Sequence, residues 1–216
     1  AQREALDAID RSLKHLTRIA EDATRVAQIE SERLSLSLSD HSVETIIRQA
    51  VGVAAADAPN RNLSLASVVD PDLGTAHVDG GSLVQALVHV ISNAVRFTPD
   101  GGRVEVRARV SGGRLVFTVS DNGVGIEPDH QRRLSEQPIA VADSLQHHSS
   151  STLEFNSAGL GLGIPIARGI AEAHGGGLLI ESQPGLGTTV TLWIPAEPGA
   201  QLEEAEQITA RRLELW

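Results

Sequence analysis

The sequence contains no cysteine, and aromatic residues make up only 2% of it. The absence of cysteine excludes disulfide bonds, cysteine-ligated zinc and catalysis by a thiol. With so few aromatic side chains, the hydrophobic core must be built from leucine, isoleucine, valine and alanine. These are present in quantity, because 41% of the 216 residues are hydrophobic, a share typical of folded globular chains.

Long apolar runs and an excess of positive charge are also missing. No apolar run approaches the roughly 20 residues that a helix needs to cross a bilayer, and no signal peptide is visible. The formal net charge of -10 argues against general binding to nucleic acid, which needs a basic surface. We therefore expect no nucleic-acid partner and no membrane contact by these residues.

Residues 1–38 have the pattern of one long helix. Its apolar residues alternate spacings of three and four, as in a coiled-coil seam, namely Leu6, Ile9, Leu13, Leu16, Ala20, Ala23 and Ala27. Such a seam needs a partner, so we expect a second copy of the chain or a separate helix to cover it. The alternative is that the helix packs on its own domain. A polar, serine-rich join at 35–42 separates this helix from the next segment.

Residues 42–196 have the pattern of a single α+β domain. Helices are expected at 43–56 with Ser42 as N-cap, at 80–98 with Asp79 as N-cap and an end before Pro99, and at 163–174. Strands are expected at 63–68, 76–78, 103–110, 115–120, 178–182 and 188–194. Residues 127–158 show no clear hydrophobic periodicity, so we expect a long loop there. We expect a short helical tail at 199–216. The order predicts a two-layer sandwich, with helices on one face of a mixed, mostly antiparallel sheet.

The helix before Pro99 carries polar residues in register on an otherwise apolar segment. His89, Asn93 and Arg96 stand at i, i+4 and i+7, so they project from one side of the helix. An apolar helix does not need such residues for folding. If they line a cleft, they can hold a metal ion and phosphates.

Two glycine-rich segments accompany this helix, at 121–126 and at 159–163. Alone, the first is typical of a tight turn and the second of a loop before a helix. A helix that follows glycines presents free N–H groups, which favour an anion. Neither segment has the spacing of the Lys-Ser/Thr phosphate loop or of the dinucleotide fingerprint.

In this order and spacing, the three segments resemble the Bergerat-type ATP-binding fold of sensor histidine kinases. Relatives with this fold include anti-sigma-factor kinases, type II topoisomerase ATPase subunits, Hsp90 and mismatch-repair ATPases. The resemblance covers about residues 42–195. It rests on an N box at 88–98, a DxGxG loop at 121–126, a GxGLG loop at 158–164, the sequence His174-Gly175-Gly176 and the glycines of 185–189.

The resemblance implies a role for each matching residue at a site for ATP and Mg²⁺. Asn93 would coordinate the Mg²⁺ ion, Arg96 would contact phosphate and Phe97 would pack on the nucleotide. Asp121 would accept the adenine amino hydrogen. Gly123 and Gly125 would let the backbone approach the base, and Ile126 would form an apolar wall. Thr188 would support Asp121 or a water at the base. The backbone N–H groups that would cradle the phosphates are those of Gly159, Leu160, Gly161, Leu162 and Gly163. Residues 127–158 would form the ATP lid.

The sequence departs from the kinase pattern in three places. His89 stands where related kinases often have Asn and hydrolytic relatives have a Glu base, so it is either a hydrogen-bonded spacer or a group that polarises water or binds metal. The lid lacks the aromatic pair that kinases usually carry. No phosphoacceptor motif occurs in 1–40, since His15 is followed by Leu16-Thr17-Arg18 instead of an acid.

The resemblance implies the catalytic part of a sensor histidine kinase, with Asn93, His89 and Arg96 as candidate catalytic residues. It would transfer the γ-phosphoryl of ATP to a His on a segment not present here. Residues 1–38 resemble the second helix of a dimerisation and phosphotransfer hairpin, which implies a homodimer and a response-regulator partner. The expected location is cytoplasmic, including the cytoplasmic part of a membrane-anchored sensor. The alternatives are a nucleotide-dependent interaction module without phosphotransfer and a Bergerat-type ATPase.

Overall fold

A five-stranded sheet organises the domain in the computed structural model, which describes residues 2–31, 33–56, 61–70, 73–136 and 162–196. The strand order is β2-β4-β5-β7-β6. The strands are β2 (Ser64–Val69), β4 (Arg103–Ser111), β5 (Arg114–Asp121), β6 (Gly177–Gln183) and β7 (Gly187–Pro195). Only β2 and β4 pair in parallel, and the other neighbours are antiparallel. The predicted mixed, mostly antiparallel sheet is confirmed.

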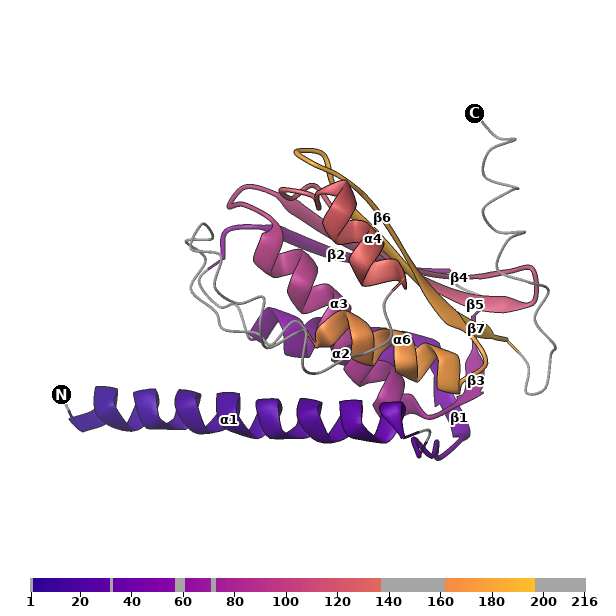
Figure 1. Cartoon of the computed structure of the whole chain (residues 1–216), viewed down its shortest axis with the longest axis horizontal. Helices are drawn as coiled ribbons and strands as arrows, with labels where there is room; N and C mark the ends of the chain where they lie inside the picture. The colour runs from indigo at the N-terminus through magenta and orange to yellow at the C-terminus, as the bar shows by residue number, and fades with distance from the viewer. Residues whose placement is uncertain (1, 32, 57–60, 71–72, 137–161, 197–216) are drawn as a thin grey trace.

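Helices α2 (Val43–Ala56), α3 (Gly80–Phe97) and α6 (Gly163–Ala173) cover one face of this sheet (Figure 1). The core between the layers is aliphatic, and Phe117 is its one fully buried aromatic residue among the residues described. Strand β4 shows how the pattern produces the layers, because Val104, Val106 and Ala108 are buried while the alternate residues Arg107 and Arg109 are exposed. The predicted two-layer α+β sandwich is confirmed.

Helix α3 is fixed at its amino end by Asp79, as its sequence predicts. Oδ1 of Asp79 accepts the Ser82 backbone N–H at 2.9 Å, and Oδ2 accepts the N–H of Ser37 at 3.1 Å. Burial alone would raise the pKa of Asp79, but the backbone N–H groups of Ser82 and Ser37 bring this pKa below its ordinary value. The helix ends at Phe97, two residues before Pro99.

The predicted helix over 1–38 is too long, and the polar join after it is partly a strand. Helix α1 spans Gln2–Glu30, and β1 (Ser39–Ser42) pairs antiparallel with β3 (Thr75–Val78). The helix stops where serines begin, because their hydroxyl groups compete for backbone partners; Oγ of Ser31 donates to the carbonyl of Ala27. Strand β1 is polar and half exposed, so it shows no alternating apolar pattern.

The two halves of α1 have different surroundings. In the carboxyl half, Val26 is completely buried, so the alternative of packing on the chain's own domain holds there. In the amino half, Leu13 and Leu16 of the seam are 61% and 62% exposed. The predicted self-association through residues 1–38 stays a prediction, and its apolar surface is available in this half.

The predicted long loop at 127–158 begins with a helix, α4 (Pro128–Glu136). This helix starts with Pro128 and has Asp129 in its first turn, and both are typical of helix starts. It was not predicted because its sequence shows no regular spacing of apolar residues. Nε2 of Gln131 donates to the carbonyl of Ile180 at 2.8 Å and holds α4 against β6. The rest of the predicted lid, residues 137–158, and the predicted tail at 199–216 lie outside the described residues. Within the described part of the chain, no helix is long and apolar enough to span a bilayer.

Candidate functional site

The polar face of α3 forms one side of the candidate site. His89, Asn93 and Arg96 are all partly buried along this face, while the opposite face is packed into the core. Phe97 at the end of the helix is 36% exposed, and the guanidinium carbon of Arg96 lies 5.4 Å from the centre of its ring. Burial lowers the pKa of Arg96, and the positive charge of Arg18 lowers it further. Because the pKa of arginine is so high, its guanidinium stays protonated even when that pKa is lowered, and it can bind phosphate.

Asp121 ends β5 and is held in place from two sides. Its Oδ1 accepts the Gly123 N–H at 2.8 Å and the N–H of Thr188 at 3.2 Å. Thr188 lies directly opposite Asp121 on β7. Burial raises the pKa of Asp121, and the two N–H donors act in the other direction. Among the described residues none donates to Oδ2, so that oxygen can accept an amino hydrogen of a ligand.

The glycines of the 121–126 loop are required by close backbone approaches. A side chain on Gly123 would collide with the carbonyl oxygen of Phe97, at the end of α3. Gly125 has φ +71°, and a side chain there would collide with the carbonyl of Gln183. The N–H of Val124 donates to the Phe97 carbonyl at 3.1 Å. The loop is therefore packed against the end of α3, which brings Asp121 to the same region as the polar face of that helix.

A serine that the sequence analysis missed supports this loop. Oγ of Ser182 accepts the N–H of Ile126 at 2.8 Å, lies 2.8 Å from Oγ1 of Thr188 and donates to the carbonyl of Gly187. The predicted support of Asp121 by Thr188 thus comes from the Thr188 backbone, while its hydroxyl contacts Ser182. No sequence motif marks Ser182, because its role follows from the pairing of β6 with β7.

The start of α6 completes the region on the other side of α3. Leu162 is 3% exposed, and among the described residues no side chain caps the helix that begins at Gly163. An uncapped first turn presents N–H groups, the arrangement that suits an anion. A Cβ atom on Gly163 would lie 3.3 Å from Nδ1 of His89, so the predicted phosphate loop and the polar face of α3 are neighbours. The predicted residues Gly159, Leu160 and Gly161 lie outside the described residues.

His89 has a partner that the sequence analysis did not foresee. Its Nε2 lies 3.2 Å from Oδ1 of Asp22 on α1, and both side chains are largely buried, with 13% and 17% exposed. The role of His89, as a spacer or as a group that polarises water or binds metal, stays a prediction, and the structure adds an acidic neighbour to one of its ring nitrogens. No local signal identifies Asp22, which is one of many acidic residues on the polar faces of α1.

The donor set on the α3 side suits Mg²⁺ bound together with phosphates. Among the described residues, no group of three or more His, Cys, Asp or Glu side chains forms a ready-made metal site. Mg²⁺ is commonly held by one or two protein oxygens, phosphate oxygens and water. The partly buried amide of Asn93, which lies about one helical turn from His89 and one from Arg96, provides such an oxygen.

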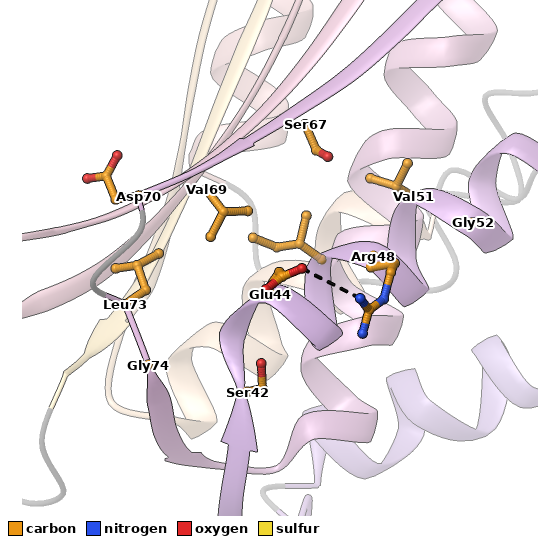
Figure 2. Close-up of a pocket in the computed structure, with 11 residues that line it drawn as sticks. Ser42, Glu44, Arg48, Val51, Gly52, Ser67, Val69, Asp70, Leu73 and Gly74 are labelled. Atoms are coloured by element: carbon orange, nitrogen blue, oxygen red, sulfur yellow. Dashed lines mark ion pairs between the residues drawn. The ribbon is translucent and has the colours of Figure 1, made fainter.

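A concave surface lies away from this region, between α2 and β2 (Figure 2). Val51, Val69 and Leu73 line it together with an ion pair of Glu44 and Arg48, whose N and O atoms are 3.5 Å apart. None of the predicted site residues lines this groove. The candidate site is therefore the region between α3, the 121–126 loop and the start of α6.

The fold and this set of residues define a Bergerat-type nucleotide-binding domain, with its N box on α3 and its DxGxG loop after β5. Residues 78–198, more than half of the chain, match the family described as histidine kinase-, DNA gyrase B-, and HSP90-like ATPase. The chain belongs to this family, and its domain is of the sensor histidine kinase type.

Individual relatives point to the same type. The histidine protein kinase DivJ of Caulobacter vibrioides is 31% identical over 89% of this chain, which covers 31% of DivJ. The solved structure of full-length ShkA in complex with AMPPNP is 28% identical, with a TM-score of 0.71, over 92% of this chain and 40% of ShkA. The histidine kinase ThkA in complex with the response regulator TrrA shares the fold, with a TM-score of 0.61 and 18% identity over 88% of this chain and 50% of that one. The chain thus spans about a third of the length of DivJ.

Proposed function

We propose that this chain is the catalytic, ATP-binding part of a two-component sensor histidine kinase. It would bind ATP with Mg²⁺ and transfer the γ-phosphoryl group to a histidine on another segment of the same or a sister chain. The observation that carries the proposal is the position of Asp121, fixed by two backbone N–H donors beside the end of the helix that bears Asn93 and Arg96.

Each part of the site has a task in this reaction. Oδ2 of Asp121 accepts the adenine amino hydrogen and orients the base, and Ile126 and Phe97 provide apolar surface for it. Asn93 holds Mg²⁺, which neutralises the charge of the phosphates when it is bound. Arg96 contacts the terminal phosphate. The N–H groups at the start of α6 hold phosphate oxygens. These residues position and neutralise the phosphates, which is most of what phosphoryl transfer requires of a protein.

The acceptor histidine attacks the γ-phosphorus through a ring nitrogen, and the bond from that phosphorus to the β–γ bridging oxygen breaks as ADP leaves. A response regulator would then receive the phosphoryl group, as the assembly of ThkA with TrrA suggests by analogy. The exposed amino half of α1, with Leu13 and Leu16, is the surface that we assign to a homodimer.

The test supplies a phosphoacceptor histidine on a separate segment. A separate dimerisation hairpin that carries a phosphoacceptor histidine, taken from a related kinase such as DivJ, is mixed with this chain and γ-labelled ATP. We expect acid-labile label on the hairpin, and much less with the Asp121→Asn variant. Binding of ATP without any transfer to several such hairpins would instead favour a nucleotide-dependent interaction module.

A further inference from the structure

The carboxyl half of α1 is packed tightly against the helical layer of the domain. Val26 is completely buried there. Gly169 of α6 has no side chain, and a Cβ atom at this position would lie 2.6 Å from Cγ2 of Ile29. The two helices can approach this closely only because residue 169 is glycine. Figure 1 shows α1 along the helical layer, with its carboxyl half beside α6.

This packing brings a carboxylate of α1 to the polar face of α3. Oδ1 of Asp22 lies 3.2 Å from Nε2 of His89, and both side chains are mostly shielded from water. The opposite ring nitrogen, Nδ1, faces Gly163 at the start of α6. The imidazole therefore lies between α1 and the first turn of α6, with Asp22 beside one ring nitrogen and Gly163 beside the other.

Arg18 lies one helical turn before Asp22, on the same side of α1. Arg96 lies about two turns beyond His89, on the same side of α3. The N–H of Ser37, after α1, donates to Asp79 just before α3, while Asp22 contacts His89 farther along α3. The two helices therefore run in roughly opposite directions, and the side of α1 that carries Arg18 lies toward Arg96. The effect of Arg18 on the pKa of Arg96, downward and through charge repulsion, agrees with this proximity. Two guanidinium groups that converge on one place favour an anion between them.

We infer that α1 forms a third wall of the nucleotide site, in which Asp22 positions His89 and Arg18 adds a positive charge for the terminal phosphate beside Arg96. The inference rests on the proposed function, because it assumes that ATP binds with its phosphates along α3. Its consequence is a linkage: docking of α1 and binding of a triphosphate stabilise each other. ADP lacks the terminal phosphate, so it gains little from the docked helix.

The first experiment compares affinities for Mg·ATP and Mg·ADP by calorimetry. Arg18→Ala should weaken binding of ATP by about fivefold to tenfold and change binding of ADP by less than about twofold. The matched control is Arg33→Ala, an exposed arginine just after α1. An unchanged ratio of ATP to ADP affinity in Arg18→Ala would overturn the inference while leaving the proposed function intact. If the wild-type chain binds neither nucleotide, the proposed function and the inference both fail.

The second experiment tests the positioning role of Asp22. Asp22→Ala and His89→Ala should each weaken ATP binding, and the double variant should be no weaker than the more affected single variant. Glu21→Ala, an exposed acid next in the chain, is the control. Fully additive losses would show that the two residues act independently and would contradict the positioning role.

A distance measurement adds a readout of docking itself. The chain has no native cysteine, so spin labels attach only at introduced positions, for which Thr24→Cys on α1 and Glu172→Cys on α6 are exposed. We expect the distance distribution to narrow with Mg·ATP more than with Mg·ADP, and Arg18→Ala to remove this difference. Identical distributions with both nucleotides in the wild-type background would argue against the linkage.

Discussion

The backbone N–H of Thr188 donates to Oδ1 of Asp121 at 3.2 Å, although 67 residues separate the two in the chain. Pairing of β5 with β7 brings them together. Because Oδ1 is occupied by this donor and by Gly123, the carboxylate cannot turn, and Oδ2 keeps one direction. The specificity of the proposed site for adenine depends on this fixed oxygen.

Replacing Asp121 with asparagine tests this relationship. The amide oxygen can still accept both backbone N–H groups, but the other position becomes an amino group that repels the adenine amino group. We expect ATP affinity to fall about 10- to 100-fold, the range for a hydrogen bond to a charged group. The Mg²⁺ dependence of the remaining binding should be unchanged. Calorimetric titration with and without Mg²⁺ measures both.

The same variant should not unfold the domain. The pKa of Asp121 is raised by burial, so the folded protein holds this proton more tightly than the unfolded chain does. The charge of Asp121 therefore makes folding less favourable as pH rises through and above the ordinary carboxyl range. Urea unfolding at pH 7 should show Asp121→Asn to be as stable as the wild type or more so. A large loss of stability would mean that Asp121 has a structural role in place of a binding one.

Gly125 should tolerate no side chain. Its φ of +71° disfavours an L-residue, and a Cβ atom would collide with the carbonyl of Gln183. We expect Gly125→Ala to lower the free energy of unfolding by about 3 kcal/mol. Gly112→Ala is the control, because its φ is +59° but the space around it is open. It should cost about 1 kcal/mol. Equal losses for the two variants, measured by urea unfolding, would show that backbone strain alone matters.

His174 should make the domain sensitive to acid. Its Nδ1–H donates to the carbonyl of Ile170 at 2.8 Å, and its Nε2 accepts the N–H of Asp79 at 3.1 Å, so the bonded form is neutral. Burial lowers the pKa of His174 below its ordinary value of about 6.5. The unfolded chain therefore takes up a proton first as pH falls. Stability that is complete above about pH 6.5 is lost as pH drops from there toward the lowered pKa.

The measurement is unfolding by urea at pH values from 8 to 5 for the wild type and His174→Gln. Glutamine can still accept the Asp79 N–H but does not titrate, so its stability should depend less on pH in this window. His77→Gln is the control, since that histidine is exposed and pairs with Asp40 on the small β1–β3 sheet. Parallel pH profiles for the wild type and His174→Gln would refute the assignment.

Elements with strong local signals could be predicted from the sequence. Helix α3 has an apolar face, an Asp79 cap and a following proline, and the β4–β5 hairpin alternates around paired glycines. The end of α1, strand β1 and helix α4 could not be predicted in the same way. Strand β1 exists because it pairs with β3, and α4 presents few apolar residues, with Leu134 packed against the core. Their stability comes from distant partners.

The same division applies to the site. Asn93, Asp121 and the loop glycines lie in short motifs whose spacing carries the resemblance to the kinase family. Ser182 and Asp22 lie in no motif, because each acts on a residue far away in the chain, Ile126 and His89 respectively. Such contacts follow from strand pairing and helix docking, which the sequence determines only through the whole fold.

The most direct test of the central claim is calorimetric titration of ATP into the wild type and Asn93→Ala, each with and without Mg²⁺. Gln85→Ala, another partly buried amide on α3, is the matched control. We predict one ATP per chain, stronger binding with Mg²⁺ for the wild type and Gln85→Ala, and loss of most of this Mg²⁺ effect in Asn93→Ala. An Asn93→Ala variant that binds ATP with the wild-type affinity and the wild-type Mg²⁺ dependence would contradict the site.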